Sequence, residues 1–305
     1  MPSPLAYLTR RALRVVAKPL IAHVDVPSAR LLQEKIGQMQ RMLNPAYLRC
    51  TLLDAGGVPV ERIDAADAPP SHRAILYLHG GGFISGNLRY TRAFGGVLAA
   101  QTGQSVYAVD YRLAPENPYP AALDDVFSAY LHLLNCGIAA RDITVVGESA
   151  GGGLVYSLCL KLRDKGLPMP GGVVGISPWA DMSCSGASYL RNAKRDPALP
   201  EEAARFYARL YAGGHEREPY ASPIFGDFSG MPRSLIFSGG DEVLLDDAIS
   251  LDARMKAAGV PSMIIVEPDM WHVYVLFGLP ESKKALHLIS AFVSETQLER
   301  YPAPL

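Results

Sequence analysis

Short apolar runs alternate along this chain with stretches of helical periodicity. The runs that predict strands are AILYLH (74–79), SVYAVD (105–110), ITVVG (143–147), VVGIS (173–177), SLIFSG (234–239) and SMIIVE (262–267). Helices are expected near 90–101, 120–136, 150–165, 246–258 and 281–297. Strands that are apolar throughout are buried on both faces, and their alternation with helices is typical of a parallel sheet covered on each side. The sequence therefore predicts an α/β fold.

Two segments lie outside this alternation, one before the first apolar run and one between the fourth and fifth runs. The sequence around Ala55-Gly56-Gly57 predicts a β-hairpin. Residues 181–219 interrupt the alternation with a stretch of roughly helical character, which is typical of an insertion above the sheet edge.

The N-terminal part predicts two amphipathic helices. The first covers about residues 5–20 with a kink at Pro19, and the second starts at about Ser28. In the first helix the apolar face consists of Leu5, Leu8, Ala12, Val15 and Val16, and the basic face of Arg10, Arg11, Arg14 and Lys18. We expect one domain, 1–305, with a cap formed by 1–45 and about 181–219.

The composition and net charge limit the classes of molecule that the chain is expected to bind. Hydrophobic residues make up 49% of the 305 residues, and the net charge is −1, so the chain can bury a large core and has no field that favours nucleic acid. The expected partner is a small neutral molecule. The four cysteines have no CxxC spacing, so they are expected to be free thiols. No run of about 18 apolar residues predicts a membrane-spanning helix, and charges interrupt the N-terminal apolar stretch, unlike in a secretory signal. A cytoplasmic location is therefore expected.

Ser149 lies in VVGESAGGGL, between Gly147 and Gly151, where a predicted strand meets a predicted helix. Small residues on both sides allow the sharp turn that exposes a serine hydroxyl. The helix that follows directs its N-terminal N–H groups toward any anion formed beside the serine. The pattern indicates a nucleophile.

A second glycine-rich stretch, YLHGGGFISG, follows the first apolar run. Gly80, Gly81 and Gly82 allow the backbone amides to approach a reacting carbonyl, as an oxyanion hole requires. The spacing differs from GxGxxG and from a phosphate loop. His79 is expected to brace this loop.

A serine nucleophile needs a histidine base and a carboxylate to orient that base. Among the seven histidines, His272 follows the last predicted strand, on the loop side where a doubly wound fold gathers its reactive groups. Asp241 follows the preceding strand and is the expected orienting acid, in the order Ser, Asp, His. No histidines have HxxxH spacing, so no metal is expected, and the chemistry needs no cofactor.

Together these motifs resemble the hormone-sensitive-lipase-like esterases of the α/β-hydrolase fold, also called bacterial lipase family IV. The matching elements, which span about 75–275, are HGGGF (79–83), DYRLAPE (110–116), GESAGG (147–152), SPW.D (177–181), GGDEVLLDD (239–247) and WHVY (271–274). Many members have Asp at the position of Glu148, and Pro-Leu after the catalytic Asp where this chain has Glu242-Val243.

The resemblance implies a mostly parallel twisted sheet of about eight strands, flanked by helices, with a helical cap. It implies Ser149 as nucleophile, His272 as base and Asp241 as its orienting acid, with the backbone amides of Gly81, Gly82 and Ala150 as oxyanion donors.

The expected activity is that of a serine carboxylesterase, acting on short- to medium-chain esters through an acyl-enzyme. The alternatives are a non-catalytic small-molecule receptor, as in the plant gibberellin receptors that resemble this family but lack the histidine, or an amidase or thioesterase with the same machinery. Membrane contact through helix 5–20 is disfavoured, and a homodimer through an edge strand or the last helix is compatible with the sequence.

Overall fold

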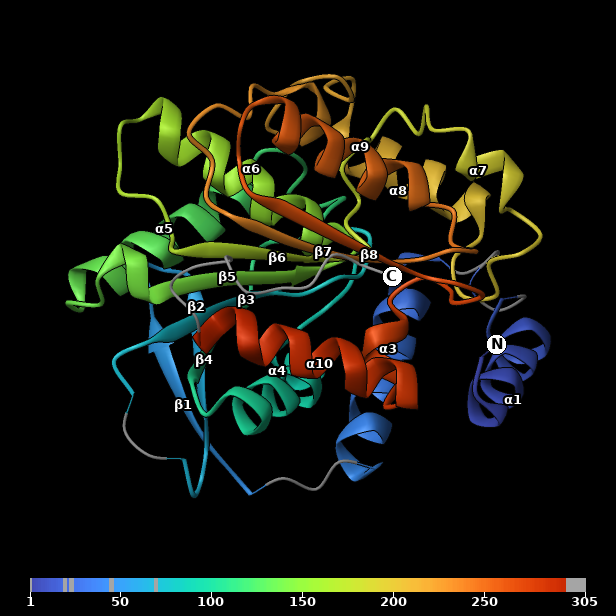
Figure 1. The fold of residues 1–305 in the computed structure, drawn as a ribbon, viewed down its shortest axis with the longest axis horizontal. Coiled ribbons are helices and arrows are strands. Elements are labelled where there is room, and N and C mark those ends of the chain that lie inside the picture. The colour runs from blue at the N-terminus through green and yellow to red at the C-terminus, as the bar shows by residue number, and fades with distance from the viewer. Residues whose placement is uncertain (1, 19–20, 22–24, 44–46, 69–70, 295–305) are drawn as a thin grey trace.

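The sheet is the centre of the structure, a computed structural model that describes residues 2–18, 21, 25–43, 47–68 and 71–294. Within these residues the strands form one sheet of eight, in the order β1-β2-β4-β3-β5-β6-β7-β8. Their bounds are β1 Leu48–Asp54, β2 Pro59–Ala65, β3 Ala74–Leu78, β4 Ser105–Val109, β5 Ile143–Glu148, β6 Gly172–Ile176, β7 Ser234–Gly239 and β8 Ser262–Glu267. Only β2 pairs antiparallel to its neighbours, β1 and β4, so the predicted mostly parallel sheet is confirmed (Figure 1).

The central strands are apolar throughout because each supplies side chains to two hydrophobic layers. In β3, Leu76 and Leu78 belong to one layer, and Ile75 and Tyr77 to the other. Successive side chains of a strand point to opposite faces of the sheet. A strand covered on both sides therefore needs no polar face, as the sequence indicated.

Helices cover both faces of the sheet, and Figure 1 shows α4 and α10 on one side and α5, α6 and α9 on the other. Their bounds are α4 Leu88–Thr102, α5 Ala121–Asn135, α6 Ala150–Asp164, α9 Leu245–Ala257 and α10 Pro280–Ser294. These lie close to the predicted ranges, although residues 295–297 of the last predicted helix fall outside the described residues. No helix in the described part of the chain is long and apolar enough to cross a membrane.

The β1–β2 hairpin forms at the predicted turn. The N–H of Gly57 donates to the carboxylate of Asp54, and the N–H of Ala55 donates to the carbonyl oxygen of Val58. Gly56 and Gly57 have φ values of 71° and 91°, which glycine adopts without steric cost.

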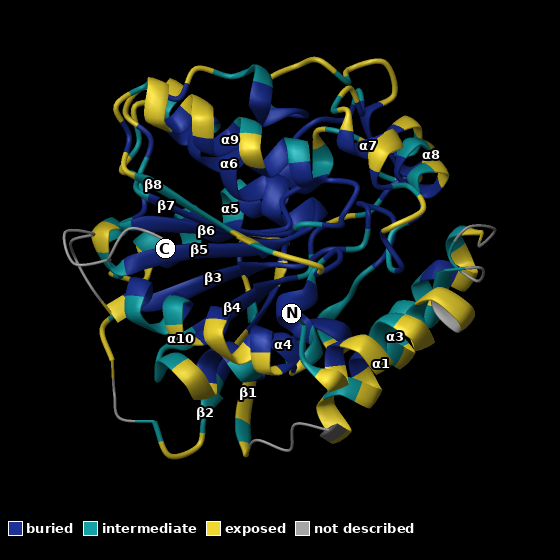
Figure 2. Ribbon diagram, turned by 45° about the vertical axis from the view of Figure 1, so that its right-hand side comes forward, coloured by how far each residue is buried: buried dark blue, intermediate teal, exposed yellow. Residues whose placement is uncertain are grey.

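The N-terminal helix α1 (Pro4–Ala12), continued by the π-helical turn η1 (Leu13–Ala17), docks through the buried Ala6 and through part of its basic side. Arg10 reaches the carboxylate of Asp241, and Lys18 donates to backbone carbonyls near residue 195. Figure 2 shows exposed residues along α1. Three apolar side chains of the helix point outward, with exposed fractions of 52%, 62% and 68%: Leu5, Leu8 and Val15. Arg10 and Lys18 thus face the protein, because their charged groups find acceptors on the body, whereas Arg11 and Arg14 are exposed. The kink predicted at Pro19 lies outside the described residues.

The other two parts of the expected cap are α3 (Val26–Leu43) and residues 181–219. The helical character predicted for residues 181–219 is limited to α7 (Ser188–Arg191) and α8 (Glu201–Ala212), and turns and loops connect them. Short 3₁₀ turns are η2 Ala140–Asp142, η3 Pro223–Phe225 and η4 Tyr274–Phe277.

Candidate active site

Ser149 occupies the sharp turn between β5 and α6. Its backbone φ is 54° and its ψ is −120°, a strained conformation that is typical of a serine at a strand-to-helix turn. A Cβ on Gly147 would lie 2.3 Å from the carbonyl oxygen of Gly151, and a Cβ on Gly151 would lie 2.1 Å from that of Leu78. The two glycines are therefore required by the close packing of the turn.

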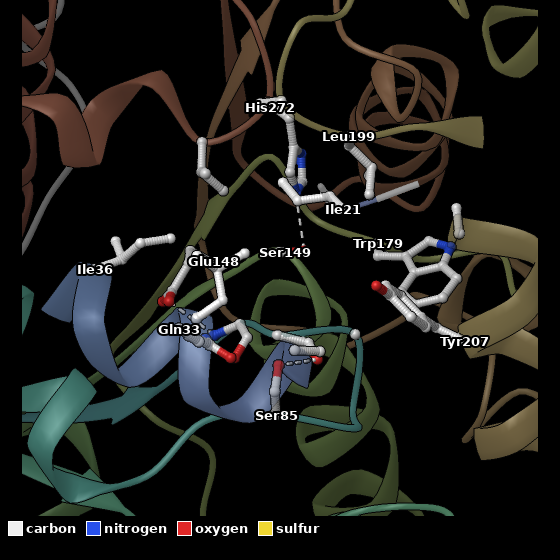
Figure 3. Close-up of a pocket in the computed structure, with 18 of the residues that line it drawn as sticks. Ile21, Gln33, Ile36, Ser85, Glu148, Ser149, Trp179, Leu199, Tyr207 and His272 are labelled. Carbon is white, nitrogen blue, oxygen red and sulfur yellow. Dashed lines mark hydrogen bonds between the residues drawn. The ribbon is translucent and has the colours of Figure 1, made fainter. Parts of the chain in front are cut away.

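His272 lies on the loop after β8 and directs its imidazole at the serine (Figure 3). The Nε2 atom of His272 is 2.9 Å from the Oγ atom of Ser149. The N–H of Val273, a residue with a φ of 52°, donates to the hydroxyl of the fully buried Ser177 at 2.9 Å. This bond anchors the loop. The structure thus brings together Ser149 and His272, in the arrangement that a general base needs to accept a hydroxyl proton.

The carboxylate that faces the other ring nitrogen of His272 belongs to Glu242. Its Oε2 atom is 3.4 Å from Nδ1 of His272, and its Oε1 atom accepts a hydrogen bond from the hydroxyl of Ser238. Glu242 is fully buried. A separation of 3.4 Å is longer than a well-aligned hydrogen bond, and contacts of this kind tighten when a substrate binds.

The position of Asp241 corrects the sequence prediction that this residue orients His272. Its carboxylate forms ion pairs with Arg10 at 2.5 Å and with Arg195 at 2.7 Å. The backbone N–H of Asp241 donates to the carbonyl oxygen of Met270, so the chain turns directly after β7. As a result Asp241 faces the arginines, and the next side chain, that of Glu242, faces the imidazole.

A signal for Glu242 was present in the sequence. In many members of the resembling family Pro-Leu follows the catalytic acid, and with Glu242 in that place the following pair is Val243-Leu244, which keeps the leucine. Two adjacent acids at the end of a strand can be told apart only by this register or by the structure.

The glycine loop after β3 lies beside Ser149. Gly81 and Gly82 have φ values of 121° and 63°, and their N–H groups have no acceptor among the described residues. A Cβ on Gly82 would lie 2.5 Å from the ring of Tyr207. Ala150 is the first residue of α6, and the first N–H groups of a helix have no partner within it.

Glu148, next to the serine, fastens the glycine loop. Its Oε1 atom accepts hydrogen bonds from the N–H of Gly80 at 2.7 Å and from the hydroxyl of Tyr90 at 3.1 Å. On the other side of the loop, Nε2 of Gln33 in α3 donates to the carbonyl oxygen of Gly80 at 3.0 Å. Burial raises the pKa of Glu148 to about 7. Sequence reasoning did not identify Gln33, because its role depends on where α3 docks.

His79 is a brace of the same loop rather than a base. Its Nδ1 atom lies 2.7 Å from the carbonyl oxygen of Gly80, and its ring stacks on that of Tyr111 at a centroid distance of 4.1 Å. Burial lowers the pKa of His79 to about 4, so the ring is neutral near pH 7.

A cavity of about 180 Å³ opens beside Ser149 and His272. Figure 3 shows Ile36 and Gln33 of α3 on one side, and Trp179 and Tyr207 on the other. Leu199 also lines it, so the walls come from the N-terminal part, the glycine loop and the segment after β6. The lining is largely apolar, with Ser149 at its edge. Among the described residues no group of three or more His, Cys, Asp or Glu side chains is arranged to hold a metal ion.

Comparison with protein families and curated proteins identifies similar chains. The family model described as the alpha/beta hydrolase fold matches residues 75–276. An acetyl-hydrolase of Streptomyces hygroscopicus is 40% identical over 224 residues, which cover 72% of this chain and 75% of that protein. An esterase of Acinetobacter venetianus is 35% identical over 247 residues, covering 80% and 81%.

Solved structures similar to this chain extend over nearly its whole length. The esterase EstE5, in a crystal soaked with p-nitrophenyl butyrate, has a TM-score of 0.89 and 37% identity, covering 96% of this chain and 99% of that one. An esterase from the bacterial hormone-sensitive lipase family has a TM-score of 0.88 and 37% identity, covering 96% and 98%.

Proposed function

The chain belongs to the α/β-hydrolase family, as a serine carboxylesterase of its hormone-sensitive-lipase-like group, and from this we propose that it cleaves short- to medium-chain esters through an acyl-enzyme on Ser149. The observation that carries the proposal is the distance of 2.9 Å between Nε2 of His272 and Oγ of Ser149 at the edge of an apolar cavity.

The proposed reaction starts with the attack of the Ser149 hydroxyl on the ester carbonyl carbon. His272 accepts the hydroxyl proton as the tetrahedral intermediate forms, and then protonates the leaving alcohol. Water then attacks the acyl carbon while His272 accepts a proton from it. The bond between the acyl carbon and Oγ of Ser149 breaks, His272 returns the proton to Oγ, and the carboxylic acid is released. Glu242 stabilises the imidazolium and holds it in the productive orientation.

The negative charge of the tetrahedral intermediate needs hydrogen-bond donors beside Ser149. We assign this role to the N–H groups of Gly81, Gly82 and Ala150, as the family resemblance implies. Two observations support the assignment: the first two groups have no acceptor among the described residues, and the third begins α6. Removal of one such donor typically lowers turnover by about 10² to 10³.

We propose that residues 1–45 and about 181–219 form a cap on the single domain. The support is that Leu32 and Gln33 from the first segment, and Leu199 and Tyr207 from the second, line the cavity over Ser149. At about 180 Å³ the cavity is smaller than the roughly 300–1,000 Å³ of typical ligand pockets, which favours short acyl chains. The acetyl-hydrolase name and the butyrate ester soaked into a similar esterase agree with this size.

The test is a series of p-nitrophenyl esters from acetate to laurate, with the wild type and Ser149→Ala. We expect the highest kcat/KM at acyl chains of about two to eight carbons and background hydrolysis with the variant. Equal rates for the two proteins would overturn the nucleophile assignment, and faster cleavage of the longest chain would overturn the substrate class.

We also propose a cellular location and an oligomeric state. The four cysteines are free, which suits the cytoplasmic location predicted from the sequence. A homodimer through the edge strand β8 or through α10 is testable by light scattering.

A further inference from the structure

Asp241, just after β7, forms ion pairs with two separate parts of the expected cap, namely α1 and the segment 181–219. Its Oδ2 atom accepts a hydrogen bond from Arg10 of α1 at 2.5 Å, and its Oδ1 atom pairs with Arg195 at 2.7 Å. The carboxylate is only 3% exposed. The loss of water from a carboxylate is costly unless cations and hydrogen bonds replace it, and here two guanidinium groups do so.

Helix α1 is tied to the same place by contacts to the backbone. Arg10 also donates to the carbonyl oxygens of Asp269, at 2.7 Å, and of Arg195, at 3.0 Å. Asp269 lies three positions before His272 on the loop that carries the base. One arginine of α1 therefore joins the loop of the acid, the loop of the base and the segment around residue 195.

The segment 192–196 in turn holds the loop of Glu242. Nδ2 of Asn192 donates to the carbonyl oxygen of Glu242 at 2.9 Å. The buried carboxylate of Asp196 accepts the N–H of Val243 at 3.1 Å. With the Arg195–Asp241 pair, three successive residues, 241–243, each have a partner in this one segment.

We propose that Asp241 is a positioning residue, through which the closed cap fixes the direction of Glu242 toward His272. The proposal rests on the function proposed above. Arg10 and Arg195 pull the side chain of Asp241 away from the site, and the next side chain is thereby directed at Nδ1 of His272. Their positive charges also balance Asp241, and Glu242 is the carboxylate that lies beside Nδ1 of His272.

The test compares Asp241→Asn, Arg10→Gln and Arg195→Gln, with Arg89→Gln as the matched control. Arg89 pairs with Glu34 of α3 at 2.7 Å, and so also joins a cap helix to the body, but it lies away from the acid loop. Because a displacement of about 1 Å in a site can cost about 10²-fold in rate, we expect Asp241→Asn to lower kcat by about 10- to 100-fold. KM for p-nitrophenyl acetate should change by less than about two-fold, because the cavity walls are intact.

Two comparisons separate positioning from general stability. We expect Arg89→Gln to keep the wild-type kcat, and Asp241→Glu, which keeps the charge, to recover part of the kcat lost in Asp241→Asn. When Arg10→Gln is added to Asp241→Asn, the further loss of kcat should be less than about two-fold, because both substitutions remove the same ion pair.

The proposal is overturned if Asp241→Asn folds and retains the wild-type kcat, or if the losses from Arg10→Gln and Asp241→Asn multiply fully. Ser149→Ala and Glu242→Gln are measured in parallel to separate this failure from that of the proposed function. If Ser149→Ala remains active, the proposed function fails. If Glu242→Gln keeps its activity while Asp241→Asn loses it by about 10⁴-fold, Asp241 is the orienting acid, and the positioning role is wrong.

Discussion

Nε2 of His272 lies 2.9 Å from Oγ of Ser149, although 123 positions of sequence separate the two residues. Parallel strands make this possible, since β5 and β8 end at the same edge of the sheet and the loops that follow them meet there (Figure 1). Glu242 lies three residues after the end of β7, the strand between β6 and β8, and so reaches His272 from the same edge.

The first prediction concerns Glu242. We expect Glu242→Gln to lower kcat by about 10² to 10⁴, because a neutral amide no longer stabilises the imidazolium and can favour the wrong tautomer of His272. The measurement is steady-state hydrolysis of p-nitrophenyl butyrate near pH 8.

Glu242→Asp is the matched variant, since it keeps the charge and shortens the side chain. A kcat between those of the wild type and Glu242→Gln is expected. If both variants turn over like the wild type, Glu242 does not have the assigned role.

The second prediction concerns the glycine loop. Gly82→Ala introduces a Cβ 2.5 Å from the ring of Tyr207 at a residue with a φ of 63°. The loop must shift, and misplacement of one oxyanion donor should lower kcat by about 10² to 10³.

Gly57→Ala is the control for the second prediction, because Gly57 also has a positive φ of 91° but has nothing within 4 Å of the added Cβ. It should lower stability without an effect on kcat. An equal loss of kcat in the two variants would contradict the assigned role of the loop.

The third prediction concerns the pH dependence of stability through Glu148. Its pKa is about 7 in the folded protein and 4.5 ordinarily, so the folded state holds the proton more tightly than the unfolded state does. Stability from this group is full below about pH 4.5 and is lost as the pH rises through 7. Glu148→Gln cannot ionise, so its stability relative to the wild type should increase over this window by on the order of 3 kcal/mol.

The measurement is urea unfolding of both proteins at about pH 5 and pH 8. His79, whose lowered pKa of about 4 makes stability rise with pH between about 4 and 6.5, is present in both proteins and drops out of the difference. A difference that is constant with pH would show that Glu148 titrates as an ordinary carboxyl.

The fourth prediction concerns the size of the cavity. Ala29 and Leu32, both of α3, line it. We expect Ala29→Leu to lower the ratio of kcat/KM for octanoate to that for acetate, and Leu32→Ala to raise it, each by about three- to ten-fold, since a methylene in an apolar pocket is worth about 1 kcal/mol or more. If neither ratio changes, the acyl chain binds elsewhere.

The sequence by itself determined the sheet, the turn at Ser149 and the loop of His272, because each depends on local rules. Apolar runs form buried strands, two glycines are needed where the backbone passes at about 2 Å from an added Cβ, and a histidine after the last strand lies at the reactive edge. Most of these features are set by residues close to one another in the chain, although Gly151 packs against the distant Leu78 of β3.

The tertiary structure decided which of two adjacent acids faces His272 and which side chains of the N-terminal helix meet the protein. Asp241 and Glu242 differ by one position, and their directions depend on Arg10 and Arg195, which are far away in sequence. Arg10 and Lys18 turn inward because their acceptors lie on loops that only the fold brings together. Such choices depend on distant partners, which local pattern and spacing do not specify.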